Sequence, residues 1–310
     1  MRDPDPLLRR IKLSDLRLFS AVVDAGGMAK AAMQLHISQP AVSKGIASLE
    51  QTLGVRLLDR HAGGVTPTIY GEALLQGSTA VFDDLGQSVG RIKFLNDPRK
   101  GKLRFGCSNP LALGFVPSVI ERMSAAYPGV RFEVFDTDDI ATLKRRQIEL
   151  AITRRFLDHE DAEVHEEILF DDPLFVYAAS DSPWARRRKI SLSDLIDAPW
   201  SIPFYNSPVG RLIVEAFRAD GLEPPKAHVK SFSIDVHLGL LATGRYVSIA
   251  SLSMLRMCAE RLSIKILPVA LRHRPSSVAI MTLKDRTLSP VAELFIKNAH
   301  EIAKQLATVR

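Results

Sequence analysis

The chain has 310 residues, of which 46% are hydrophobic and 25% charged, and 41 lysines and arginines against 35 aspartates and glutamates leave a net charge of +6. This length predicts two domains, and the apolar content excludes a chain that is mainly disordered. Because only two cysteines occur, Cys107 and Cys258, a disulfide framework and a four-cysteine zinc site are excluded as well.

Three short helices are predicted in the first 54 residues. Ser14 is a suitable N-cap for a helix over 15–25, and an alanine-rich helix follows over 28–35. A third helix begins after Ser38 and ends at Gly54. Three short helices separated by tight turns are the outline of a helix-turn-helix unit.

The third helix has an apolar face and a polar face. Val42, Ile46 and Leu49 recur at helical spacing and are expected to pack on the other two helices. Hydroxyls, an amide and an ammonium near a helix N-terminus suit the major groove of DNA, although a solvated polar face is the alternative for this patch taken alone. The side chains predicted to face DNA are Ser38, Gln39, Pro40, Ser43 and Lys44.

Residues 58–68 predict a β-hairpin that turns at Gly63 and Gly64. A hairpin beside a DNA-reading helix is a wing. Arg56 and Arg60 are therefore expected to contact the phosphates of the DNA backbone.

The run Ser38-Gln39-Pro40-Ala41-Val42-Ser43, followed by Leu49-Glu50, is a specific signature. With the apolar positions on either side of it, over residues 12–75, it resembles the winged helix-turn-helix of the LysR-type transcriptional regulators. The resemblance implies a DNA-binding domain over residues 1–67. The sequence departs from the family pattern at Gly27, Gly45 and Leu58, and Gly45 is expected to remove one base-contacting side chain from the DNA-facing part of the third helix.

Residues 68–96 predict one long helix, which a hinge over 97–101 follows. The alternating intervals of four and three give a 3.5-residue period, and such a seam needs a partner. We interpret it as a dimerisation helix, as the resemblance also implies, with packing onto the chain's own second domain as the alternative. The seam consists of Leu74, Ser78, Val81, Leu85, Ser88, Ile92 and Leu95.

Strand patterns alternate with helical patterns over residues 102–310, which predicts an α/β domain with largely parallel sheets. Two lobes are expected, lobe I over about 102–172 and 276–310 and lobe II over about 173–275. The order and length resemble the effector-binding domain of LysR-type regulators, which is similar to the two-lobed periplasmic solute-binding proteins.

A ligand is expected beyond the carboxyl ends of the strands of both lobes. Ser108-Asn109-Pro110 and Asn206-Ser207-Pro208 each follow a strand and open a helix, and two helix N-termini facing one cleft would favour a carboxylate, although plain capping is the alternative. Thr153 and Arg154 are expected to supply a donor and a counter-charge, and Phe204 an apolar wall. The family resemblance adds positions around Ser233 and at the strand end Ile249–Ser251. The predicted effector-binding residues are Ser108, Asn109, Thr153, Arg154, Phe204, Asn206, Ser207, Ser233, Ile249 and Ser251.

No nucleotide-binding, metal-binding or nucleophile motif occurs, so no cofactor, metal or catalytic residue is predicted. The sequence predicts a DNA-binding transcriptional regulator, not an enzyme, controlled by a small molecule, of which an organic acid is the expected type. Its expected partners are promoter DNA, this effector, further copies of itself as a homodimer or homotetramer, and RNA polymerase as a candidate. No signal sequence or membrane-spanning run is seen, which predicts a cytoplasmic location without membrane contact. The alternatives are a two-lobed enzyme and a solute-binding protein with an accessory N-terminal domain.

Overall fold

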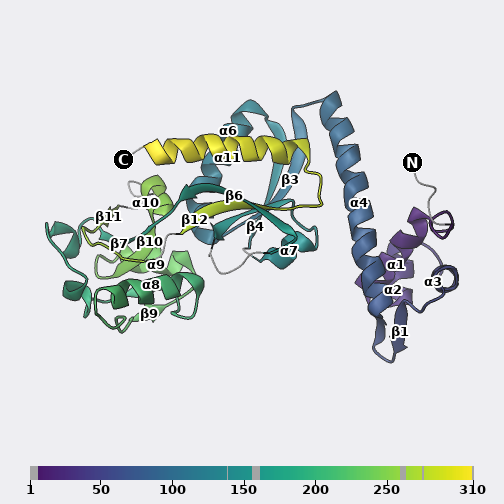
Figure 1. Cartoon of the computed structure of the whole chain (residues 1–310), viewed down its shortest axis with the longest axis horizontal. Coiled ribbons are helices and arrows are strands. Elements are labelled where there is room, and N and C mark those ends of the chain that lie inside the picture. The colour runs from purple at the N-terminus through teal and green to yellow at the C-terminus, as the bar shows by residue number, and fades with distance from the viewer. Residues whose placement is uncertain (1–5, 138, 156–160, 259–262, 274–275, 309–310) are drawn as a thin grey trace. The chain divides into compact units, whose positions relative to one another are not determined.

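A computed structural model describes residues 6–137, 139–155, 161–258, 263–273 and 276–308 of the chain. It divides into two compact units, Met1–Val89 and Gly90–Arg310 (Figure 1). Within these described ranges, none of the helices has both the length and the apolar character that crossing a membrane requires.

The first unit contains three helices, α1 (Leu13–Ala25), α2 (Met28–Leu35) and α3 (Gln39–Leu53). Phe19, Val42 and Ile46 are fully buried between them. The prediction that Ser14 caps α1 is wrong. The helix begins two residues earlier, because the Asp15 carboxylate accepts the backbone N–H of Lys12 at 3.0 Å and makes Lys12 the N-cap.

A two-stranded antiparallel hairpin follows, β1 (Leu58–His61) and β2 (Gly64–Pro67). The predicted turn is displaced by one residue, because Gly64 already pairs with His61 and the turn lies over Ala62 and Gly63. Gly64 has φ +133°, and a Cβ atom there would lie 2.2 Å from the carbonyl oxygen of Gly26. That carbonyl accepts the Val65 N–H at 3.1 Å, so the close approach that fixes the wing on the α1–α2 turn requires glycine.

The helix α4 (Ile69–Asn96) is 28 residues long. It begins at Thr68, whose hydroxyl accepts the backbone N–H of Gly71 at 3.2 Å. Phe94, near its end, packs against the core of lobe I in the second unit. Four apolar members of the predicted seam are nevertheless exposed in the single chain: Val81, Leu85, Ile92 and Leu95.

Lobe I is built on a five-stranded sheet with the order β4-β3-β5-β12-β6. The core of lobe I lies between this sheet and the helices α6 and α11, which run side by side (Figure 1), and Phe105, Phe115 and Phe295 are fully buried in it. The elements of the lobe are β3 (Lys100–Cys107), β4 (Gly129–Asp136), β5 (Leu150–Arg155), β6 (Val164–Asp171), β12 (Ser277–Leu283), α5 (Asn109–Leu113), α6 (Phe115–Ala126), α7 (Ile140–Lys144) and α11 (Pro290–Thr308).

The prediction of largely parallel sheets is wrong. Only β4 and β5 run parallel to β3, whereas β12 is antiparallel to both β5 and β6. The chain leaves for lobe II at the end of β6 and returns at the start of β12. The two crossings are adjacent, since the Asp172 N–H donates to the Ser276 carbonyl at 2.9 Å. β6 enters this junction with its C-terminal end, and β12 leaves it with its N-terminal end. The two strands therefore run in opposite directions.

Lobe II has an antiparallel three-stranded sheet, β10-β7-β11, and a parallel pair, β8-β9. Trp200 and Phe217 are fully buried on one side of the larger sheet, with their rings edge to face at 5.8 Å. Tyr177 and Met254 are buried in a second cluster. The elements are β7 (Leu174–Ala179), β8 (Ser201–Ile202), β9 (Val229–Lys230), β10 (Val247–Ser251), β11 (Ile264–Ile266), α8 (Pro208–Ala219), α9 (Ile234–Leu241), α10 (Leu252–Cys258) and two short 3-10 turns, Trp184–Arg186 and Ser193–Leu195.

Candidate functional site

The polar face of α3 is the first candidate site. Ser38 is committed to its own helix, because its hydroxyl accepts the Ala41 N–H at 3.4 Å. Ser43 is half-buried and its hydroxyl lies 3.8 Å from the sulfur of Met28. Gln39 and Lys44 remain exposed together with Pro40 on the side away from the buried stripe. The helix thus presents an amide and an ammonium near its positive end.

Gly45 has a structural role in addition to the one predicted. A Cβ atom at this position would lie 2.2 Å from Cδ2 of Leu18, a residue of α1. Position 45 therefore also lies at the contact between α1 and α3. The glycine leaves room there for the Leu18 side chain, and the loss of a base-contacting side chain at this position stays a prediction.

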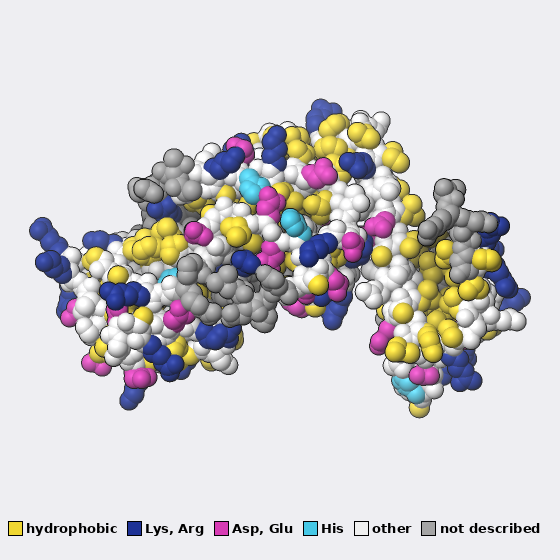
Figure 2. All heavy atoms as spheres, viewed as in Figure 1, with side chains coloured by type: hydrophobic (Ala, Val, Ile, Leu, Met, Phe, Trp, Pro, Cys, Tyr) yellow, Lys and Arg dark blue, Asp and Glu magenta, His cyan; other side chains and the backbone are white. Residues whose placement is uncertain are grey.

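The wing is joined to α3 by a carboxylate. Oε1 of Glu50 accepts the backbone N–H of Leu57 at 2.8 Å and that of Leu58 at 3.3 Å. These bonds hold the connection that contains Arg56, and they fix the first residue of β1, which also carries Arg60. Both arginines are exposed. Figure 2 shows lysine and arginine side chains gathered on one edge of this unit.

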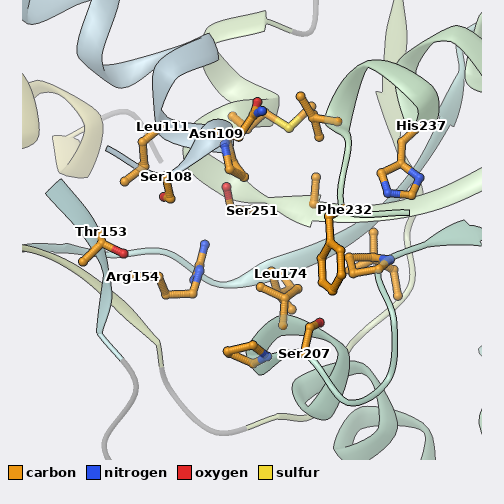
Figure 3. Close-up of a pocket in the computed structure, with 18 of the residues that line it drawn as sticks. Ser108, Asn109, Leu111, Thr153, Arg154, Leu174, Ser207, Phe232, His237 and Ser251 are labelled. Carbon is orange, nitrogen blue, oxygen red and sulfur yellow. The ribbon is translucent and has the colours of Figure 1, made fainter. Parts of the chain in front are cut away.

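The second candidate site is a cavity of about 460 Å³ between the two lobes (Figure 3). Lobe I contributes the residues that follow β3 and β4 and the end of β5, and lobe II contributes β7, β10 and the starts of α8 and α9. The volume lies in the range of sites for small organic ligands. Seven predicted residues line it: Ser108, Asn109, Thr153, Arg154, Ser207, Ile249 and Ser251.

Three predicted effector residues lie outside this lining. Asn206 is exposed, and its carbonyl oxygen accepts from Arg211 at 3.0 Å. Ser233 precedes α9, and its backbone N–H donates to Ser231 Oγ at 3.0 Å. Phe204 lies behind the cavity, with its ring centroid 4.9 Å from that of Phe232, which takes the place at the wall that was predicted for Phe204.

Arg154 is held rigidly at the junction of the lobes. Its Nη1 donates to the Asp172 carbonyl and to Ser276 Oγ, both at 2.6 Å, and its Nη2 donates to Asp172 Oδ2 at 2.7 Å. The Asp172 carboxylate also accepts from the N–H and the hydroxyl of Ser253, at 2.8 and 2.9 Å. The side chains of Arg154 and Asp172 are only 10% and 1% exposed. Burial lowers the pKa of Arg154, and the charge of Asp172 opposes this effect.

The positive charge that Arg154 was expected to offer a ligand is therefore already balanced by Asp172 inside the protein. A guanidinium has five N–H donors, and three are committed to Asp172 and Ser276. Arg154 can offer the others to a ligand from a fixed position. It would act mainly as a directed hydrogen-bond donor, because its net charge is offset by Asp172.

His237 is a lining residue that the sequence analysis missed. Its Nδ1 lies 2.7 Å from the Ser201 hydroxyl and its Nε2 lies 3.1 Å from the Ser231 carbonyl. Because a carbonyl only accepts, Nε2 carries the hydrogen and Nδ1 accepts from Ser201. Burial lowers the pKa of this imidazole. Other residues that the analysis missed are Asp136, Thr137, Leu174, Phe232 and Ile234.

Nucleophilic chemistry is not supported at Cys107, which is buried beside this site. Burial raises the pKa of its thiol to about 11, so the reactive thiolate is disfavoured. Among the residues that the structure describes, no group of three or more histidine, cysteine, aspartate or glutamate side chains is placed to hold a metal ion.

Comparisons with known proteins match both parts of the chain. The sequence matches the description "LysR substrate binding domain" over residues 96–304 and "Bacterial regulatory helix-turn-helix protein, lysR family" over residues 13–72. It is 31% identical to the HTH-type transcriptional regulator GbpR of Azospirillum brasilense, over 92% of this chain and 85% of that protein. It is 29% identical to the HTH-type transcriptional regulator BenM of Acinetobacter baylyi, over 78% of this chain and 81% of that protein.

The fold is similar to that of full-length CbnR in complex with its target DNA, with a TM-score of 0.64. The likeness covers 94% of this chain and 100% of the CbnR chain, at 20% sequence identity.

Proposed function

The chain belongs to the LysR family and is a DNA-binding transcriptional regulator with an effector-binding domain, and from this premise we propose which residues serve each task. The two rival functions, an enzyme and a solute-binding protein, are not favoured, because the family matches cover a DNA-binding part as well as a ligand-binding part. The proposed division is a DNA-binding domain over residues 1–67, a linker helix over 68–96, a hinge over 97–101 and an effector domain over 102–310.

The DNA proposal rests on the exposed face of α3. Gln39 reads base edges in the major groove, and Lys44 contacts phosphate beside it, with Ser38, Pro40 and Ser43 shaping the approach. Arg56 and Arg60 contact phosphates from the wing. The observation that carries the proposal is the burial of Val42, Ile46 and Leu49, which leaves only this side of the helix free for DNA.

Substitution of Gln39 and of Lys44 separates the two kinds of contact. Gln39→Ala is expected to lower the preference for the protein's own upstream DNA over random DNA, by about 1–3 kcal/mol for a good base contact. Lys44→Ala is expected to weaken binding to both DNAs alike and to flatten the salt dependence. Mobility-shift titrations at two salt concentrations measure both effects. An unchanged ratio for Gln39→Ala would remove that residue from base reading.

We also propose that the cleft binds an organic acid. Ser108, at the start of α5, is the N-cap by position, yet its hydroxyl makes no capping hydrogen bond and is directed into the cavity together with Thr153 and the fixed guanidinium of Arg154 (Figure 3). These donors, with the positive end of α8, favour negative charge. The apolar side chains of lobe II suit a carbon body.

Replacement of Ser108 tests the cleft. Ser108→Ala is expected to weaken binding of small monocarboxylates measured by calorimetry, while DNA binding without ligand and the thermal midpoint persist, because the hydroxyl caps nothing. Ser207→Ala is the matched control for capping: its hydroxyl accepts the Gly210 N–H at 3.0 Å and donates to the Phe204 carbonyl at 2.6 Å, so its loss should cost about 1 kcal/mol of stability. Equal carboxylate affinities for wild type and Ser108→Ala would contradict the proposal.

Assembly and location follow from the same reading. We propose a homodimer joined through α4, and a homotetramer joined further through the effector domains, with RNA polymerase as a partner at the promoter. The cytoplasm is the proposed compartment because promoter DNA lies there.

A further inference from the structure

A large aromatic side chain is left in solvent at the edge of the cleft. Phe232 is 72% exposed and also lines the cavity, and Figure 3 shows its ring pointing into the space on the side of Leu174 and Ser207. Buried aromatic rings contribute strongly to protein cores and interfaces. Most of the surface of this ring is instead free of protein contact, and the ring lines the ligand space.

The back of the ring is supported by a second phenylalanine. Phe204, from the segment after β8, lies with its ring centroid 4.9 Å from that of Phe232 and its ring plane tilted by 34°. Phe204 does not itself line the cavity. It therefore contacts Phe232 from outside the cavity lining.

The backbone on either side of Phe232 is fixed. The Ser231 N–H donates to the Ile202 carbonyl at 3.2 Å, and the Ser231 carbonyl accepts from Nε2 of His237 at 3.1 Å. The Ser233 N–H closes back on the Ser231 hydroxyl at 3.0 Å. These bonds fix the backbone from which the ring projects, so a ligand that contacts the ring does not have to order this segment.

The cavity lining contains a group of donors and an aromatic ring on different lobes. Lobe I presents the donors of Ser108, Thr153 and Arg154 beside the Asp136 carboxylate, whereas lobe II presents Phe232 and Leu174 together with polar His237. A ligand whose acid group meets the three donors would place its other end against Phe232.

We propose that Phe232, supported by Phe204, is a specificity-determining residue that selects an effector with a flat, unsaturated ring over one with a saturated ring of the same size. This inference rests on the proposed binding of an organic acid in the cleft and adds the class of its carbon body. Offset or edge-to-face ring contacts add roughly 2- to 12-fold in affinity beyond the burial of area.

Phenylacetate and cyclohexylacetate form a suitable probe pair, because each has a carboxylate, one methylene and a six-membered ring, and only one ring is flat. Calorimetry on the full-length protein should show that phenylacetate binds roughly 2- to 12-fold more tightly. Phe232→Leu, which keeps an apolar side chain but removes the ring, should abolish this preference and leave the affinity for cyclohexylacetate unchanged. Ligand-observed NMR should show upfield ring-current shifts of bound cyclohexylacetate protons in wild type and not in Phe232→Leu.

Two further variants control the experiment. Phe204→Leu removes the support and should lower the preference for phenylacetate less than Phe232→Leu does. Val236→Ala removes an exposed apolar side chain of α9 outside the cavity lining and should change nothing.

Other outcomes would overturn the inference in distinguishable ways. If wild type binds phenylacetate and cyclohexylacetate equally and Ser108→Ala binds neither, the acid site stands and ring selection is rejected. If Phe232→Leu binds both probes more tightly than wild type, Phe232 obstructs the cavity and does not select the ring. A lower molar mass of Phe232→Leu in light scattering, with unchanged probe affinities, would make the ring part of an interface between copies. Binding of neither probe to wild type would reject ring selection, and failure of all small carboxylates would reject the acid site itself.

Discussion

Ser108 and Ser207 have the same position relative to a helix, yet their hydroxyl groups have different partners. The hydroxyl of Ser207 both accepts and donates within its own turn and has no remaining hydrogen to offer. That of Ser108 makes no capping bond. The two sequence motifs are nearly identical, so this difference is visible only once the turns are built. We therefore expect Ser108 to contact the ligand and Ser207 to stabilise its helix.

His237 gives a pH dependence at the residue scale. Burial lowers its pKa below the usual 6.5, so the unfolded chain binds a proton at this residue more readily than the folded chain does. The stabilising contribution is therefore fully present above about pH 6.5 and is lost as the pH falls through the depressed folded pKa. The denaturation midpoint of wild type should drop between pH 7.5 and pH 5.5 by more than that of His237→Gln. If the denaturation midpoints of His237→Gln and wild type fall by the same amount between pH 7.5 and pH 5.5, another group causes the loss of stability at low pH.

At the scale of single elements, α4 leaves the apolar seam residues from Val81 onward exposed in the part of the chain that the structure describes. Leu85 is 48% and Ile92 68% exposed in the single chain, whereas Ser78 is buried and donates to the Leu74 carbonyl at 2.6 Å. An apolar stripe of this period in water is expected to pair with the same stripe of a second copy.

Leu85→Lys together with Ile92→Lys should separate the dimer, because four charged ends would face one another across the seam. Light scattering should then give half the mass of the wild-type assembly, because contacts through the effector domains remain, and operator binding should be lost because two recognition helices must be linked to occupy two half-sites. Gln76→Lys with Gln87→Lys adds the same charge on the opposite face of the helix and should leave the mass unaltered. An unchanged assembly in the first variant would exclude α4 from dimerisation.

At the scale of the effector domain, both chain crossings between the lobes meet in one buried network. Arg154 comes from β5 of lobe I, Asp172 and Ser276 lie on the two crossings, and Ser253 belongs to α10 of lobe II. The network therefore links the cleft to the chain crossings at Asp172 and Ser276. Any change at Arg154 on ligand binding would act directly on the two chain crossings between the lobes.

Asp172→Asn should destabilise the effector domain by about 3–5 kcal/mol, because it leaves the buried guanidinium without its charge partner. Arg154→Met combined with Asp172→Leu should recover much of this loss, since neither charge then remains buried. Differential scanning calorimetry of the full chain measures both, and DNA binding at low temperature checks that the first unit is intact. A double variant no more stable than Asp172→Asn would show that the loss comes from packing and not from charge.

The sequence by itself determined the features that depend on neighbours along the chain. Helix periodicity, the Ser38 cap, the glycine breaks and the Ser-Gln-Pro signature located the helix-turn-helix, the linker helix and the two-lobed fold, because local propensity and one apolar face per element suffice for these. Only the tertiary structure decided which groups converge. It placed Phe232 in front of Phe204, turned Gly45 towards Leu18, and paired Arg154 with Asp172 across 18 positions. Such contacts depend on where separate elements cross and on the opposite directions of β6 and β12, and neither composition nor period carries that information.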